Sequence, residues 1–224
     1  MEIQLLTKKM SNRIFSEIMN VPDAYLILDA VGKALDEERE RRLQFYNDIT
    51  DEQKVEFING EIIVHSPAQK RHGRILFRLA HLIDIYVMER DLGLVGGEKC
   101  MITLTRNDYE PDICFFRKEK AERTTDKQTL FPAPDFVVEI LSPSTQSRDR
   151  GVKYDDYQAH GIEEYWIVDP ELEFLKQYHL VGNKYAEVLN SGTGLVHSFA
   201  IKGFQIPVRA IFDDTENLKA IKNL

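Results

Sequence analysis

The chain has 224 residues, of which 43% are hydrophobic and 29% charged, a balance that is ordinary for one globular domain with or without an appendage. Its net charge of −8 argues against a general nucleic-acid coat, which is normally basic, but leaves room for an enzyme that contacts nucleic acid through a local patch. No apolar run reaches the ~20 residues of a membrane span, and the first residues lack a signal-peptide pattern, so the sequence predicts a cytoplasmic protein without a membrane segment.

The beginning of the chain predicts a helical arm. Residues 22–49 mix charges of both signs, and acid-to-base spacings such as Glu38 to Arg42 favour an exposed helix. We therefore expect two parts, an N-terminal helical arm at 1–49 and a domain at 50–224.

A hairpin and an amphipathic helix are predicted next. Asn59-Gly60 is the preferred pair for a two-residue turn, because both of its positions need a positive φ, and it joins two strand-like runs. Ser66 is then the expected N-cap of a helix with Pro67 in its first position. Apolar residues recur at helical spacing from Ile75 to Val87.

The second half predicts strands around one further helix. Residues 99–116 predict two strands joined by a turn, and the nearly continuous apolar run at 136–141 predicts a central strand covered on both faces. A helix at 149–160 leads to another apolar strand at 163–170, and antiparallel strands follow. The order predicts an α/β domain with one mixed central β-sheet flanked by α-helices. The two cysteines, at 100 and 114, are expected to be buried free thiols.

Two carboxylates interrupt these apolar runs and call for an explanation. Asp112 starts one strand, and Glu139 stands in the middle of another. If the strands are adjacent, the two carboxylates repel each other unless a cation lies between them, and Mg²⁺ suits such a site because it takes one or two carboxylates and completes its shell with water and phosphate. The alternative is that each acid lies at a strand end, facing solvent or pairing with an arginine.

The helix that follows carries a second candidate group. Asp149, Lys153 and Tyr157 lie at i, i+4 and i+8 and share one helix face. Asp149 and Lys153 could form only a surface ion pair. If this face lies over the strand that bears Glu139, Lys153 would reach the metal site and could orient or help to deprotonate an attacking water.

In their order along the chain these residues resemble the Uma2 family, a group of restriction-endonuclease-like proteins in the PD-(D/E)XK nuclease superfamily. The resemblance rests on "EFINGEIIVHSP", on Pro111-Asp112, on "VVEILSPST", and on a block that runs through Lys153 and Tyr157 to "GIEEYWIVDP". It extends from about residue 50 to about residue 180. It implies a restriction-endonuclease-like fold and divalent-metal-dependent hydrolysis of phosphodiester bonds.

The resemblance also implies roles for individual residues. Asp112 matches the aspartate of the PD motif and Glu139 the acid of the (D/E)XK motif, so both would bind Mg²⁺ or Mn²⁺ together with the backbone carbonyl of Ile140. The motif's lysine position is held here by Leu141. Lys153, from the neighbouring helix, is the candidate for the missing catalytic base or water-orienting group, with Asp149 and Tyr157 supporting it.

Two more positions match the family pattern. Glu61 after the hairpin turn could add a third acid to the metal site, or it could be a solvated strand residue. Glu56, at the other end of the hairpin, is a weaker candidate for the same role. His72 at the start of the long helix could contact phosphate, or it could be a hydrogen-bonded core histidine.

Basic residues near that helix start are candidates for nucleic-acid binding. A helix N-terminus favours anions, and the sequence concentrates cations there and near the second helix: Lys70, Arg71, Arg74, Arg148 and Arg150. The alternative for each is a solvated charged surface.

The resulting expectation is a metal-dependent endonuclease that acts on DNA rather than RNA, working as a homodimer if it cuts both strands. Because Leu141 replaces the motif's lysine, an alternative is a catalytically inactive nuclease-fold protein that binds nucleic acid or a protein partner. A glycosidase with two carboxylates is a third alternative, but it would need a sugar-binding cleft and would leave Lys153 without a role.

Overall fold

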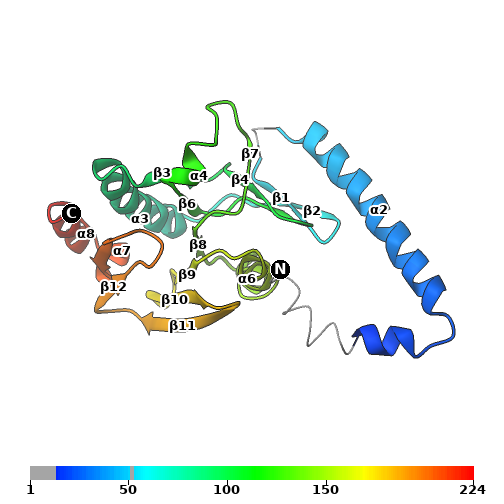
Figure 1. Ribbon diagram of the computed structural model, residues 1–224. Coiled ribbons are helices and arrows are strands. Elements are labelled where there is room, and N and C mark those ends of the chain that lie inside the picture. Colours follow the sequence, from blue (N-terminus) through cyan, green and yellow to red (C-terminus); the bar gives the residue numbers. More distant parts are fainter. Residues whose placement is uncertain (1–13, 51–52) are drawn as a thin grey trace.

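The computed structural model describes residues 14–50 and 53–224 (Figure 1). The predicted first helix is confirmed as α2 (Ala24–Asp48), which runs along the edge of the molecule. Its buried residues are Glu38 and Phe45, both in its second half, whereas the first half is exposed. The predicted boundary at residue 49 stays a prediction, and the part of the arm at residues 1–13 lies outside the described residues.

Arg42 fastens the second half of α2 to the domain. Its guanidinium group donates hydrogen bonds to both carboxylate oxygens of Asp108, at 2.6 and 2.8 Å, and to the carbonyl oxygens of Leu104 and Asn107. Asp108 is fully buried, so this pair neutralises a carboxylate that would otherwise be costly to bury.

The predicted hairpin is confirmed as β1 (Val55–Ile58) and β2 (Glu61–Val64). Its turn residues have φ values of 51° at Asn59 and 85° at Gly60, as a two-residue turn of this type requires.

The long amphipathic helix α3 (Lys70–Glu89) begins later than predicted. Ser66 does not cap it, because the chain stays extended through Gln69 (φ −69°, ψ 152°), and Gln69 is the N-cap. The helix buries the expected apolar face together with His72.

A six-stranded sheet forms the centre of the fold, in the order β11-β10-β9-β8-β6-β3. Only β8 and β9 are parallel, and α5 and α6 connect them in a βαβ crossover, whereas the other neighbours are antiparallel. The bounds are β3 (Gly93–Gly97), β6 (Ile113–Arg117), β8 (Phe136–Ile140), α5 (Gln146–Asp149), α6 (Val152–Ala159), β9 (Glu164–Asp169), β10 (Phe174–Val181) and β11 (Lys184–Ser191).

The fold class is confirmed, but the strands are divided among more than one sheet. The hairpin pairs with β5 instead of a central strand, and this gives a second, five-stranded sheet in the order β2-β1-β5-β4-β7. The remaining elements are β4 (Met101–Thr103), β5 (Asp108–Tyr109), α4 (Lys118–Ala121), β7 (Leu130–Phe131), β12 (Leu195–His197), β13 (Gln205–Pro207), α7 (Arg209–Phe212) and α8 (Asp214–Ile221).

Strand β3 was not predicted, because three of its five residues are glycine and glycine normally weakens a strand. Close packing explains two of these glycines, Gly93 and Gly96. A Cβ atom at Gly93 would lie 2.0 Å from the carbonyl oxygen of Phe116, and one at Gly96 would lie 2.8 and 2.9 Å from the sulfur atoms of Cys114 and Cys100. Both cysteines are free and buried, as predicted.

Side chains from the two faces of β8 enter different cores. Phe136, Val138 and Ile140 pack with residues of α3, α7 and α8, whereas Val137 and Leu141 pack with residues of α6 and of the five-stranded sheet. Glu139 follows the alternation of Val137 and Leu141, so it points toward α6.

Among residues 14–50 and 53–224, no helix has the length and apolar character that crossing a membrane requires.

Candidate functional site

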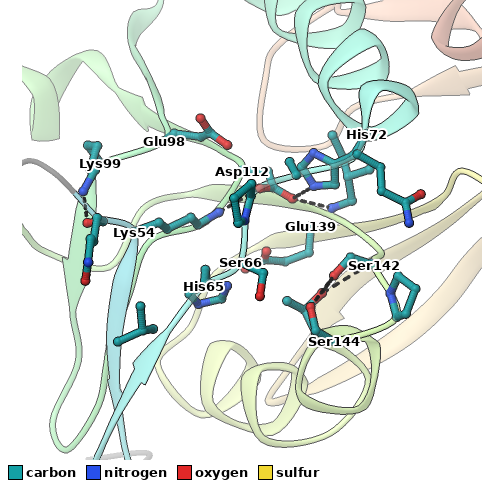
Figure 2. A pocket seen from close by; sticks show the side chains of 18 of the residues that line it. Lys54, His65, Ser66, His72, Glu98, Lys99, Asp112, Glu139, Ser142 and Ser144 are labelled. Carbon is teal, nitrogen blue, oxygen red and sulfur yellow. Dashed lines mark hydrogen bonds and ion pairs between the residues drawn. The ribbon is translucent and has the colours of Figure 1, made fainter.

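Adjacent strands bring Asp112 and Glu139 together. Ile113 of β6 pairs with Val138 of β8 and Cys114 with Val137, so continuing the register by one residue sets Asp112 opposite Glu139. Both are 3% exposed, and both line one cavity of about 730 Å³ (Figure 2). The two carboxylates therefore meet at the end of the β6–β8 ladder.

Helix α6 supplies the cation for Glu139. The ammonium group of Lys153 lies 3.0 Å from Oε1 of Glu139, and the hydroxyl of Tyr157 donates to the same oxygen at 2.8 Å. Leu141, in the motif's lysine position, is buried in the core. The lysine thus reaches the acid from the neighbouring helix, as the sequence suggested.

Asp149 joins this group from just outside α6. The predicted single helix at 149–160 is two helices, because the chain breaks at Arg150 and Gly151 between α5 and α6. Asp149 nevertheless keeps its i, i+4 relation to Lys153, with Oδ1 at 3.4 Å from the ammonium nitrogen. Both carboxylate oxygens of Asp149 are buried without a hydrogen-bond partner among the described residues.

The third acid beside Lys153 is Glu56 and not Glu61. Glu56, on β1, is fully buried, and its Oε1 lies 2.8 Å from the ammonium nitrogen of Lys153. Its Oε2 lies 3.0 Å from Nε2 of His65. Glu61 is exposed on β2, at the edge of the five-stranded sheet, and is not among the residues that line the cavity. Of the two interpretations of Glu61, the structure thus matches the solvated strand residue, and the weaker candidate Glu56 is the acid beside Lys153.

Asp112 is held by groups from α3, from β8 and from the residue before β1. Its Oδ1 lies 2.9 Å from the ammonium nitrogen of Lys54, and its Oδ2 accepts the backbone N–H of Ile140 at 2.8 Å and lies 3.2 Å from Nε2 of His72. Burial opposes ionisation, but Lys54 and His72 outweigh it and hold the pKa of Asp112 well below its usual range. His72 is thus a buried partner of Asp112.

The electrostatics of the group favour a charged lysine, but they do not act alike on its three acids. Burial raises the pKa of Asp149 above its ordinary value, although Lys153 opposes this. Burial opposes the charge of Lys153, but Glu139, Glu56 and Asp149 raise its pKa well above the ordinary value. Burial likewise opposes ionisation of Glu56, yet Lys153 and His65 lower its pKa to about 2. For Glu139, burial together with the neighbouring carboxylates outweighs Lys153 and raises the pKa to about 8.

This arrangement fits a hard divalent cation. Asp112 and Glu139 offer carboxylate oxygens on one cavity wall, and Ile140 lines the same wall. Oε2 of Glu139 accepts no hydrogen bond from the described residues, whose donors reach Oε1 instead. In the part of the chain that the structure describes, no three His, Cys, Asp or Glu residues form a ready set of metal ligands. Two carboxylates with water and phosphate completing the shell are the pattern that Mg²⁺ prefers.

Of the predicted nucleic-acid contacts, the basic residues lie outside this cavity. None of the five basic residues lines it, whereas His72 does. Arg71 pairs with Glu171 at 2.7 Å, Arg74 pairs with Asp214, and Arg150 lies 3.4 Å from Asp169. Lys70 lies beside Arg71 and Arg74 on the wall of a neighbouring pocket, and the Nε atom of Arg148 is buried without a described partner. Arg71, Arg74 and Arg150 therefore match the alternative of a solvated charged surface, on which each of them forms an ion pair.

Lys54 and His65 are site residues that the sequence did not reveal, and His65 lines the cavity beside Glu56. Lys54 precedes the hairpin, in a stretch with no motif, and it contacts Asp112 only through the tertiary fold. Glu56 was the weaker of the two hairpin candidates, and the structure explains its role, because an acid in a strand with four buried positions needs a cation.

Comparison with known proteins supports the same fold and family. Residues 37–209 match the model of the Uma2 family, whose description is "Putative restriction endonuclease". A crystal structure of "a putative nuclease belonging to DUF820 from Anabaena variabilis ATCC 29413" superposes with a TM-score of 0.65 and 21% identity, covering 75% of this chain and 94% of that one.

Two relatives come from Synechocystis sp. (strain ATCC 27184 / PCC 6803 / Kazusa), and both are called uncharacterized. The protein sll1609 is 27% identical over 134 residues, which are 59% of this chain and 75% of the relative. The protein slr1290 is 30% identical over 130 residues, which are 57% of this chain and 66% of the relative.

Proposed function

The chain belongs to the Uma2 family, and on that premise we propose that it is a divalent-metal-dependent endonuclease that hydrolyses phosphodiester bonds in DNA. The observation that carries the proposal is the convergence of three residues at one cavity: Asp112, just before β6, Glu139 on β8 and Lys153 on α6. The resident ion would be Mg²⁺ or Mn²⁺, held by the two carboxylates with the carbonyl oxygen of Ile140.

A bound divalent ion supplies the charge that polarises a phosphodiester and lowers the pKa of a water ligand. The protein's own residues hold the carboxylates that bind it. Ile140 N–H and His72 fix one oxygen of Asp112, and Lys153 and Tyr157 fix one oxygen of Glu139. This fixed geometry is what electrostatic catalysis requires, because the site does not have to reorganise when charge develops.

Lys153 acts in this proposal as a permanent ammonium group. Since three carboxylates keep its pKa well above the ordinary value, it does not take a proton from water at neutral pH. It can instead donate hydrogen bonds, keep Glu139 in position and add positive charge beside the phosphate. Of the two roles considered for this lysine, orienting the water is the one that its contacts support.

Cleavage assays with matched variants test the proposal. Purified protein is incubated with supercoiled, linear and single-stranded DNA and with RNA, in Mg²⁺, in Mn²⁺ and with chelator. We expect cleavage of DNA that chelator abolishes. Asp112→Ala and Glu139→Ala should abolish cleavage, whereas Glu61→Ala, which removes an exposed acid away from the cavity, should leave it intact. Circular dichroism of each variant establishes that it is folded.

Cleavage that survives in both folded site variants would contradict the assignment. Tight Mn²⁺ binding with no cleavage of any nucleic acid would favour the alternative of an inactive nuclease-fold protein. The position of Lys153 argues against that alternative, because the cation expected two residues after the acid is supplied from α6.

A further inference from the structure

Lys54 holds the oxygen of Asp112 that a metal ion would need. Oδ2 of Asp112 already binds the N–H of Ile140 and lies against His72, so Oδ1 is the oxygen left for a cation. In the structure that oxygen lies 2.9 Å from the ammonium nitrogen of Lys54, and Figure 2 shows the lysine reaching across the cavity to it.

The two lysines of the cavity are held very differently. Lys153 is 2% exposed and lies within 3.4 Å of three carboxylates. Lys54 has a side chain that is 20% exposed, and among the described residues its ion-pair partner is Asp112 alone. A lysine with one partner and a flexible four-carbon stem can leave at much lower cost than one fixed by three.

We propose that Lys54 is a tethered cation that competes with the divalent ion for Oδ1 of Asp112 and must move away when the ion binds. This inference rests on the proposed function, because it assumes that the site takes a metal. Lys54 stabilises the buried carboxylate pair when the ion has been removed. It lowers the affinity for metal by the free energy of the Lys54–Asp112 ion pair, because that pair must break when the ion binds. The released ammonium group stays in the cavity, where it can pair with a substrate phosphate.

Neutral substitutions of Lys54 provide the test. Mn²⁺ is titrated by calorimetry into protein stripped of metal by chelation, for wild type and for Lys54→Met, Lys54→Gln and Lys54→Arg. A hydrogen bond between charged groups is worth enough that its loss should tighten Mn²⁺ binding roughly 10- to 100-fold in the Met and Gln variants. The Arg variant keeps a cation and should keep the wild-type affinity.

Lys99 provides a matched control. It lines the same cavity, but its ammonium group donates to the backbone carbonyl of Gln53 and not to a metal-site carboxylate. Lys99→Met should therefore change the affinity by less than about threefold, which excludes a general effect of cavity charge. The Gln variant can still donate a hydrogen bond to Asp112, so it remains informative if the Met variant fails to fold.

The outcomes separate this inference from the proposed function. If wild type binds Mn²⁺ and cleaves DNA but the folded neutral variants bind no more tightly, the role of Lys54 is refuted and the function stands. If the neutral variants bind Mn²⁺ where wild type does not, the inference is supported. If no form of the protein binds Mn²⁺, both proposals are refuted.

Discussion

Replacing Glu139 with glutamine should make the protein more stable at neutral pH while removing a carboxylate that the proposed chemistry needs. The substitution is close to isosteric. Oε1 of the glutamine can accept the same hydrogen bonds from Lys153 and Tyr157, and the new amide group takes the place of Oε2, which has no donor among the described residues. The main change is therefore the loss of an ionisable group at a crowded, buried position.

The size of the effect follows from the pKa of Glu139, which is raised from 4.5 to about 8. Between these two pH values the unfolded chain has released this proton and the folded protein retains it, so the folded state binds more protons and wild-type stability falls as the pH rises. At about 1.4 kcal/mol for each pH unit, the full difference is on the order of 5 kcal/mol. Water entering the cavity reduces this cost, so we expect a gain of ~2–5 kcal/mol for Glu139→Gln above about pH 8.

Urea denaturation at a series of pH values measures this difference. The advantage of Glu139→Gln should be absent below about pH 4.5, grow through the window up to pH 8, and then level off. Glu61→Gln, which changes an exposed acid, should match wild type at every pH. A variant that is less stable than wild type throughout, or whose advantage does not depend on pH, would refute the electrostatic account of the site.

Two further substitutions test other parts of the structure. Lys153→Met leaves the buried acids Glu56, Asp149 and Glu139 without their shared cation and should cost ~3–5 kcal/mol at neutral pH, and less at low pH where the ionised acids take up protons. A loss below ~1 kcal/mol in urea denaturation would count against the buried network. Arg42→Met leaves buried Asp108 without its guanidinium partner and should cost ~2–4 kcal/mol and expose α2 to protease. Arg39→Met is its control, because the Arg39 side chain is 78% exposed, and equal protease resistance of the two variants would contradict the proposed anchor.

Much of the fold and the centre of the site could be predicted, because they follow from short-range patterns. Strand alternation predicts that Glu139 faces the side opposite to Val138 and Ile140, and helical spacing predicts that Lys153 and Tyr157 share a face. The right-handed path of a βαβ crossover then brings that face over the strand. From the sequence, the meeting of the acid and the lysine was conditional on that helix face lying over the strand, and the structure places Lys153 3.0 Å from Glu139.

These short-range rules could not predict that Glu56, and not Glu61, is the buried acid of the hairpin. The two acids flank the same turn, and nothing in the hairpin sequence tells which of its strands is central. That depends on β5, which follows some fifty residues later and pairs with β1, leaving β2 at the edge. Burial of Glu56 is therefore a property of the sheet order.

The same limit applies to Lys54 and to the start of α3. Ser66 and Pro67 have the chemistry of a helix start, yet the chain stays extended past them and lines the cavity. Lys54 belongs to no periodic pattern, and its partner Asp112 lies 58 positions away. Contacts of this kind can be found only once the segments are folded against each other.

The pairing of β6 with β8 has a consequence for how this protein can evolve. Inserting a single amino acid in β8 ahead of Glu139 would exchange the two faces of the strand. The carboxylate of Glu139 would then point into the apolar core beside α3, and an apolar side chain would face the cavity. Folding and any chemistry at the cavity would be lost in the same step. Insertions within β8 are therefore expected to be tolerated less well than insertions in the surface loops.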